Sequence, residues 1–168
     1  MIILRSEGKN FCAGANFGQD EDMLDKSVPY KKLYAQAVRL FKTKKPVIAV
    51  VQGAAIGGGL GLALSADFRI ACPEARFAAN FAKLGFHPGF GSSVTLPRVI
   101  GTQKAMDMLF TARRVGGEEA FDIGLADKLT SLETLMQTAK EFAEEISSLS
   151  KEKSKVSKKK NERHEEER

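Results

Sequence analysis

The hydrophobic and polar positions of the chain predict strands and helices in alternation around one central segment. Residues 47–51 form an apolar run rich in valine and isoleucine, bounded by proline and glycine, which is typical of a strand covered on both faces. A run of glycines follows, and the leucine- and alanine-rich segment up to Leu64 then predicts a tightly packed helix. The centre of the predicted fold is therefore a buried strand, a glycine turn and a helix.

The flanking segments continue this alternation. Residues 1–4 predict the end of a buried strand, and from about Pro29 apolar side chains recur at helical spacing as far as Phe41. Aromatic residues and glycines mix in residues 80–93, which predicts an irregular loop that lines a pocket. The other predicted elements are strands at 67–72, 76–78 and 126–130, and helices at about 93–99, 103–110, 116–123 and 132–149.

The glycine turn at residues 57–59 is a candidate site for an anion or an oxyanion. Consecutive glycines leave backbone N–H groups accessible, and the start of the next helix adds a partial positive charge. A dinucleotide fingerprint does not fit, because the sixth position counted from Gly57 is Leu62. A phosphate-binding loop does not fit either, because no lysine followed by serine or threonine comes after these glycines. The alternative is that the glycines only let the helix pack close to the strand.

Composition indicates one globular domain followed by a charged tail. The chain has 168 residues, of which 43% are hydrophobic, and no apolar run approaches the ~18 residues of a membrane-spanning helix. Residues 151–168 hold eight Lys or Arg and five Asp or Glu, and so account for +3 of the net charge of +5. We therefore expect a domain at residues 1–149 and a solvated, disordered tail at 150–168. Nucleic-acid binding is not expected, since the domain itself is nearly neutral.

Two cysteines, Cys12 and Cys72, give neither a metal-ligand spacing nor a disulfide framework. We expect no metal site and a reducing compartment inside a cell, with the mitochondrion and the cytoplasm both open. For Cys12 we expect a buried position in a small gap.

The order of several motifs resembles the crotonase superfamily, which is the enoyl-CoA hydratase/isomerase family. The resemblance extends from residue 1 to about residue 149. Residues 8–16 are similar to the GxxFxAGAD loop of that family, and residues 45–53 are similar to its strand before the glycine run. The other matching segments are residues 57–59, 66–71, 76–77, 84–85, 88–89, 96–101 and 120–126.

The resemblance implies an α/β fold, a crotonase-like spiral of ββα units, here truncated at both the N- and the C-terminal end. It implies an acyl-CoA thioester as the substrate, with coenzyme A as part of that substrate and no separate cofactor. Two backbone N–H groups would stabilise the thioester enolate, and by motif position they belong to Ala15 and Gly58. The family further implies a homo-oligomer or a subunit of a larger complex.

The resemblance also assigns residues that bind the substrate. Lys9 matches a residue that contacts the phosphates of coenzyme A, although a solvated loop lysine is the plain alternative. Asn16 stands where the family usually has aspartate. The full set of expected substrate-binding residues is Lys9, Ala13, Asn16, Ile56, Gly57, Asn80, Phe81 and Gly89.

The catalytic carboxylates of the family are absent from this chain. The positions of the two hydratase glutamates hold Gly61 and Phe81, and the position of an isomerase aspartate holds Gly89. None of these residues transfers protons. His87 is the best remaining proton carrier, and the alternative is a histidine satisfied by loop carbonyls. Two hypotheses follow: an enoyl-CoA hydratase/isomerase-like protein that stabilises an enolate, or a catalytically inactive structural subunit.

Overall fold

Seven short strands form two sheets in the described part of the computed structural model, which covers residues 1–14 and 28–148, with only the backbone of 28–34. The first sheet is parallel, in the order β1 (Ile2–Leu4), β2 (Val47–Val51), β4 (Phe68–Ala71) and β7 (Lys128–Leu129). The second sheet has the order β3 (Ala54–Ile56), β5 (Arg76–Ala78) and β6 (Val115–Gly116), and its β5–β6 pair is antiparallel.

The strands and helices repeat as ββα units. Strands β2 and β3 lead into one helix, and β4 and β5 lead through a loop into the next, while β2 pairs with β4 and β3 pairs with β5. This confirms the predicted α/β class and the crotonase-like arrangement. The prediction of a glycine turn directly after residues 47–51 was wrong in detail, because residues 54–56 form a strand of the second sheet. Strand β6 was also missed, since a strand of two residues leaves no periodic pattern.

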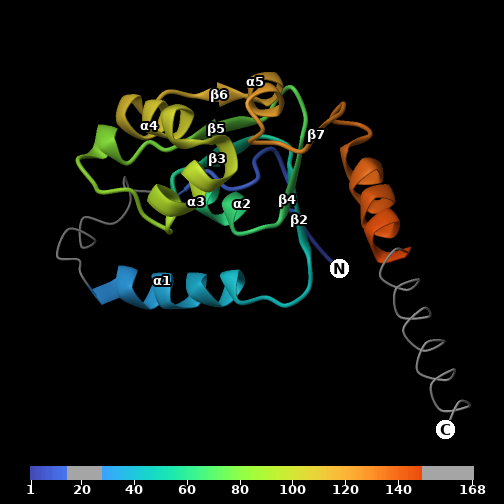
Figure 1. Ribbon diagram of the computed structural model, residues 1–168, viewed down its shortest axis with the longest axis horizontal. Helices are drawn as coiled ribbons and strands as arrows, with labels where there is room; N and C mark the ends of the chain where they lie inside the picture. The colour runs from blue at the N-terminus through green and yellow to red at the C-terminus, as the bar shows by residue number, and fades with distance from the viewer. Residues whose placement is uncertain (15–27, 149–168) are drawn as a thin grey trace, which may run out of the picture.

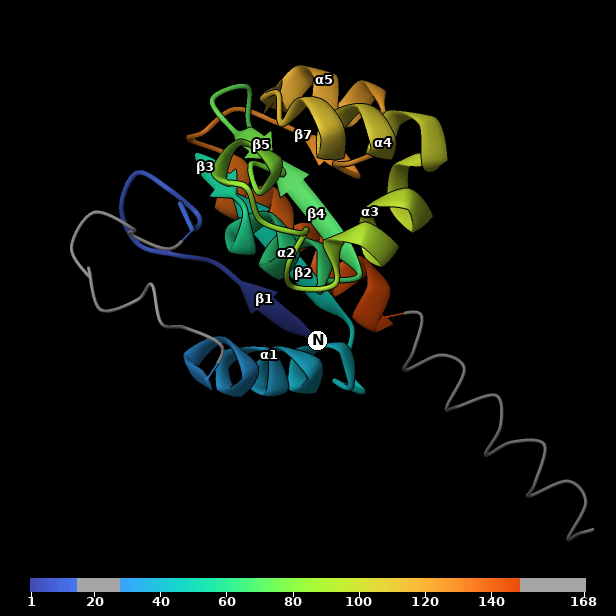
Figure 2. The same cartoon turned by 90° about the vertical axis from the view of Figure 1, so that its left-hand side faces the viewer.

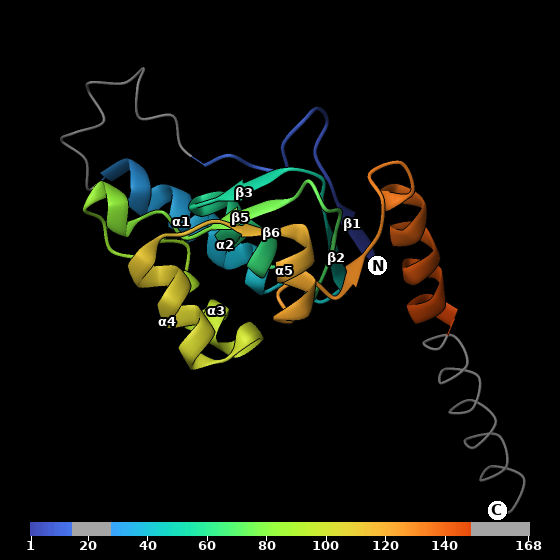
Figure 3. The same cartoon turned by 90° about the horizontal axis from the view of Figure 1, so that it is seen from above.

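The helices cover the two sheets from several sides. Figure 1 shows α1 along one side, with α2 and α3 between it and the second sheet, and Figure 2 shows the same order from the side. Figure 3 shows α3 beside α4, with the helix formed by residues 135–148 at the opposite end of the molecule. The other helices of the described residues are α1 (Val28–Phe41), α2 (Gly58–Leu64), the 3-10 helix η2 (Ala82–Leu84), α3 (Ser92–Ile100), α4 (Thr102–Thr111) and α5 (Gly117–Asp122).

The core lies between α2 and the central strands. Ile48, Val51, Leu60, Ile70 and Phe77 are all buried there, as the apolar run and the leucine-rich helix predict. Full burial of one such side chain contributes about 1.5–3 kcal/mol to stability. The core therefore fixes the position of α2 against β2.

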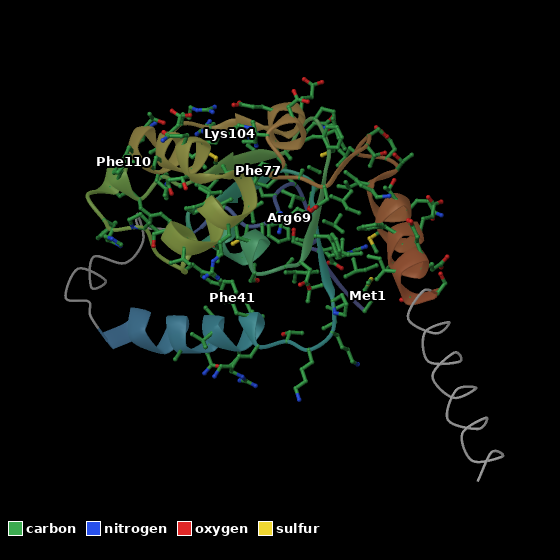
Figure 4. All side chains as sticks on the ribbon, viewed as in Figure 1. Met1, Phe41, Arg69, Phe77, Lys104 and Phe110 are labelled. Carbon is green, nitrogen blue, oxygen red and sulfur yellow. The ribbon has the colours of Figure 1, made fainter. Side chains whose placement is uncertain are left out.

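One charged side chain, Arg69, is buried in this core on β4 (Figure 4). Its Nε donates to the Leu125 carbonyl at 2.7 Å, its Nη1 donates to the Ala66 carbonyl at 2.8 Å, and its Nη2 lies 3.3 Å from a carboxylate oxygen of Asp127. Burial lowers the pKa of Arg69, and the charge of Asp127 opposes that effect. These contacts hold the segment before β7 against the first sheet.

The helix at residues 135–148 packs its apolar face on the first sheet, as its sequence predicts. Leu135 and Ala139 are buried, and the ring of Phe142 lies edge-on to Phe68 with 5.0 Å between centroids. None of the helices in the described residues is long and apolar enough to cross a membrane.

Candidate functional site

The turn before α2 takes a conformation that requires glycine. Gly57 has φ 55° and ψ −114°, and its N–H donates to the Ala78 carbonyl at 2.9 Å. A Cβ atom at this position would lie 2.8 Å from Oδ1 of Asn80. The turn is therefore fixed by β5 on one side and by the Asn80 side chain on the other.

Gly59 is required by close packing against Cys12. A Cβ at Gly59 would collide with the carbonyl group of Cys12, and Gly59 itself is buried. Cys12 is in turn bound to β3, since its N–H donates to Ala54 at 2.8 Å and its carbonyl accepts the Ile56 N–H at 3.0 Å. The loop of residues 6–14 is thereby attached both to β3 and to the first turn of α2.

Gly58 differs from both neighbours, because close packing does not explain why this position is a glycine. A Cβ at Gly58 would meet no heavy atom within 4 Å. Gly58 is the first residue of α2, so its N–H has no acceptor inside the helix, and no carbonyl elsewhere in the described residues accepts it. The interpretation of the glycines as packing alone therefore accounts for Gly57 and Gly59, but it explains neither the glycine at position 58 nor the unpaired backbone donor there.

The Gln52 side chain organises the loop that leads toward Ala15. Its Nε2 donates to Oγ of Ser6 at 2.8 Å, to the Ser6 carbonyl at 3.1 Å and to the Gly8 carbonyl at 3.2 Å. Asn10 adds a further bond, because its Oδ1 accepts the Ala54 N–H at 3.2 Å. Sequence reasoning missed Gln52, since nothing local to a glutamine after a strand shows which loop it contacts.

An apolar cavity of about 440 Å³ lies between α1, α3 and the loop before α3. The ring of Phe90 is part of its wall, and the ring of Phe41 on α1 lies 6.2 Å from it between centroids. Figure 4 shows Phe41 pointing from α1 toward the rest of the molecule. All lining side chains are uncharged: Ala37, Val38, Phe41, Pro88, Gly89, Phe90, Gly91, Val94 and Thr95.

Phe90 connects this cavity to α2. A Cβ at Gly61 would lie 2.7 Å from Cγ and 2.8 Å from Cδ1 of Phe90, and closer still to its Cβ. Gly61 lies three residues after Gly58 on α2, so Phe90 packs on the same helix about one turn beyond Gly58. The position where the resemblance expects a glutamate thus holds a glycine against which an aromatic ring packs.

The structure brings several of the predicted site residues together at the turn. Ile56, Gly57 and Gly58 are consecutive there, and a Cβ at Gly57 would lie within 4 Å of both Asn80 and Phe81. Gly89 lies at the apolar cavity, and its carbonyl accepts bonds from the N–H and Oγ of Ser92.

Of the other predicted residues, Ala13 lies beside this group, since its neighbour Cys12 accepts the Ile56 N–H and its neighbour Gly14 approaches the Ile56 carbonyl. Lys9 and Ala13 are exposed on the loop of residues 6–14. His87 is exposed as well, with Nδ1 3.3 Å from the carbonyl of Pro88, and it does not line the apolar cavity. Ala15 and Asn16 lie outside the described residues, as does the predicted tail at 150–168.

The cysteines show no sign of nucleophilic or metal chemistry in the described residues. Cys72 is fully buried, and burial raises the pKa of its thiol to about 11, with further increases from the neighbouring Glu74. Cys12 is only partly buried, which corrects the expectation that it fills a small buried gap. No cluster of three or more histidine, cysteine or acidic side chains that could hold a metal ion occurs in residues 1–14 and 28–148.

The sequence as a whole, residues 1–168, matches the family described as enoyl-CoA hydratase/isomerase. The chain belongs to this family. Among curated members, it is 39% identical over 150 residues to the short-chain-enoyl-CoA hydratase of Clostridium acetobutylicum, which covers 86% of this chain and 57% of that enzyme. It is 40% identical over 149 residues to the crotonyl-CoA hydratase of Syntrophomonas wolfei, with 87% of this chain and 57% of that enzyme covered.

Solved structures of the enoyl-CoA hydratase/isomerase family have the same fold. The crystal structure of an enoyl-CoA hydratase from Bacillus anthracis superposes with a TM-score of 0.82 at 34% identity, over 88% of this chain and 58% of that chain. The chain thus spans just over half the length of the relatives it matches.

Proposed function

We propose that this protein binds an acyl-CoA thioester and stabilises its enolate through two backbone donors, the N–H groups of Gly58 and Ala15. The observation that carries this proposal is Gly58 itself, because packing does not require a glycine there and its N–H has no backbone acceptor in the described residues. A fixed donor at the first turn of a helix suits an oxygen on which negative charge develops. Ala15 is the proposed second donor because of its position in the loop motif of residues 8–16.

The apolar cavity, which no residue of the turn lines, is the proposed site of the acyl group. Its lining has no charged side chain, and it is joined to α2 by Phe90. Each CH₂ group that leaves water for such a cavity contributes about 0.8 kcal/mol. Lys9, exposed on the neighbouring loop, is the proposed contact for the coenzyme A phosphates, and Asn80 and Asn16 would donate hydrogen bonds to the ligand.

Hydration by a pair of glutamates is not part of this proposal. Gly61 and Phe81 occupy the corresponding positions, and the Phe90 ring packs on Gly61. His87 is the proposed group that gives a proton to, or takes one from, the enolate. Its side chain is exposed, so a movement of the loop before α3 would have to bring it to the substrate.

A second candidate function is binding without turnover, as a structural subunit of a homo-oligomer or larger complex. The observation that favours it is the composition of the cavity, in which none of the lining residues has an ionisable side chain. A site that holds a thioester but carries no acid or base binds its ligand and leaves it unchanged.

Calorimetry with coenzyme A, acetyl-CoA and butyryl-CoA tests the shared part of both candidates. We expect butyryl-CoA to bind more tightly than coenzyme A, and the absence of heat with all of them would refute acyl-CoA binding. Assays on crotonyl-CoA and a 3-enoyl-CoA, with His87→Ala beside the wild type, then separate the two candidates. Turnover that the variant loses supports catalysis, whereas binding without turnover supports the structural role.

A further inference from the structure

Phe90 has an unusual backbone conformation. Its φ is 55°, in the left-handed region that residues with a side chain seldom adopt, and the next residue, Gly91, is also left-handed with φ 68°. Bulky residues are held in this region only where the surrounding structure determines their position, and such positions concentrate at functional sites. The backbone of this loop therefore places the Phe90 ring in a defined direction.

One side of Phe90 packs directly on α2. The ideal Cβ position of Gly61 falls 2.7 Å from Cγ and 2.8 Å from Cδ1 of Phe90, which is too close for any side chain other than hydrogen. Cβ of Phe90 lies closer still and its position is fixed by the backbone, so rotation of the side chain does not relieve the contact unless the loop moves. The glycine at position 61 and the phenylalanine at position 90 therefore form a complementary pair.

Phe90 also forms part of the wall of the apolar cavity. The cavity lining includes Phe90 but no residue of α2, although Phe90 touches α2 at Gly61. The ring therefore lies between the cavity and α2 at Gly61, about one helical turn beyond Gly58. Across the cavity the Phe41 ring is tilted at 56° to it, with 6.2 Å between centroids.

We propose that Phe90 is a specificity-determining residue that closes one end of the cavity and so limits the length of the acyl chain that binds. This inference rests on the proposed function, since it takes the apolar ligand to be the acyl group of a coenzyme A thioester. Removal of the ring joins the cavity to the space that the ring fills above Gly61. Extra methylene groups of a longer chain then leave water for that space.

The test is a series of dissociation constants for saturated acyl-CoA esters from two to twelve carbons, which undergo no hydration. Phe90→Ala is expected to move the tightest-binding length upward by at least two carbons. It is also expected to raise the affinity for the longest ester about tenfold relative to butyryl-CoA, from two more buried CH₂ groups. Phe90→Leu should give a smaller shift. Phe110→Ala, at an exposed position on α4 outside the cavity, should leave the profile as in the wild type (Figure 4).

Two outcomes would overturn the inference alone. One is an unchanged length profile in Phe90→Ala, and the other is an equal loss of affinity at every length, which would mean that the ring only supports the fold. If the wild type binds no ester of any length, acyl-CoA binding itself fails and the inference fails with it.

A double-mutant cycle tests the pairing of the two positions without any ligand. Gly61→Ala should lower the urea midpoint of the wild type and should have little effect in the Phe90→Gly background, because the Cβ and the ring that clash with a side chain at position 61 are then both gone. An equal loss of stability in both backgrounds would show that Phe90 does not fill the space above Gly61, and would overturn the inference.

Discussion

Two adjacent glycines at the start of α2 should respond in opposite ways to the same substitution. Gly58→Ala puts a methyl group where no heavy atom lies within 4 Å, whereas Gly59→Ala drives one into the carbonyl group of Cys12. Both changes restrict the unfolded chain to a similar degree, which stabilises the native state by about 0.4–1 kcal/mol where the methyl group fits. The pair therefore isolates the effect of close packing.

The expected cost at Gly59 follows from the contacts of Cys12. Overpacking at a tight contact costs about 1–3 kcal/mol, and displacement of Cys12 also weakens its two backbone hydrogen bonds to β3, at about 1 kcal/mol each. After the gain from the restricted unfolded chain, Gly59→Ala should lower the free energy of unfolding by about 2–4 kcal/mol. Gly58→Ala should leave it unchanged or raise it by up to about 1 kcal/mol.

Urea unfolding followed by circular dichroism measures this difference. With a slope of about 2 kcal/mol per molar urea, the midpoint of Gly59→Ala should fall by about 1–2 M, while that of Gly58→Ala stays near the wild-type value. Equal midpoints for the two variants would refute the reasoning, because they would mean that Gly58 is packed as tightly as Gly59.

Further predictions concern the charged and thiol groups of the core. Arg69→Met should lower the free energy of unfolding by about 3 kcal/mol, because it leaves the Leu125 and Ala66 carbonyls without their donor and Asp127 without its ion-pair partner, although the N–H of residue 69 still donates to Asp127. Arg113→Met, at exposed ion pairs with Asp107 and Glu119, should cost less than about 1 kcal/mol. Similar losses in the two variants, measured by urea unfolding, would contradict this account. Stability should also fall as the pH rises from about 9 to 11, since the Cys72 thiol ionises near 9.0 when unfolded but near 11 when folded, so the unfolded state alone loses its proton in that range. Cys72→Ala should show a shallower decline in the urea midpoint over the same pH range, and an identical slope would contradict the assignment to Cys72.

The sequence predicted the parts of this fold that local patterns determine. The apolar run at residues 47–51 is a strand because its side chains suit burial on both faces, and the glycines at 57–59 do precede a helix. Strand β3 was not predictable in the same way, because Ala54 and Ala55 become a strand only by pairing with β5 and with Cys12. The conformational preferences of neighbouring residues do not indicate which distant strands will pair.

The candidate site likewise contains residues that the sequence indicates and residues whose roles depend on distant contacts. Motif order identified Gly58, but the role of Phe90 depends on a contact with Gly61 that is 29 positions away along the chain. The exposure of His87 likewise depends on the path of the loop before α3, which the mixture of glycines and aromatic residues leaves undetermined.

The central claim is that the Gly58 N–H binds the thioester oxygen, and one comparison of variants tests it most directly. Proline is favoured at the first position of a helix, which Gly58 occupies, so Gly58→Pro removes the donor and keeps the helix, whereas Gly58→Ala keeps both. Calorimetry with crotonyl-CoA should give a dissociation constant about tenfold higher for the proline variant than for the alanine variant, as the loss of one hydrogen bond of about 1.4 kcal/mol requires. Equal dissociation constants in two folded variants would contradict the claim.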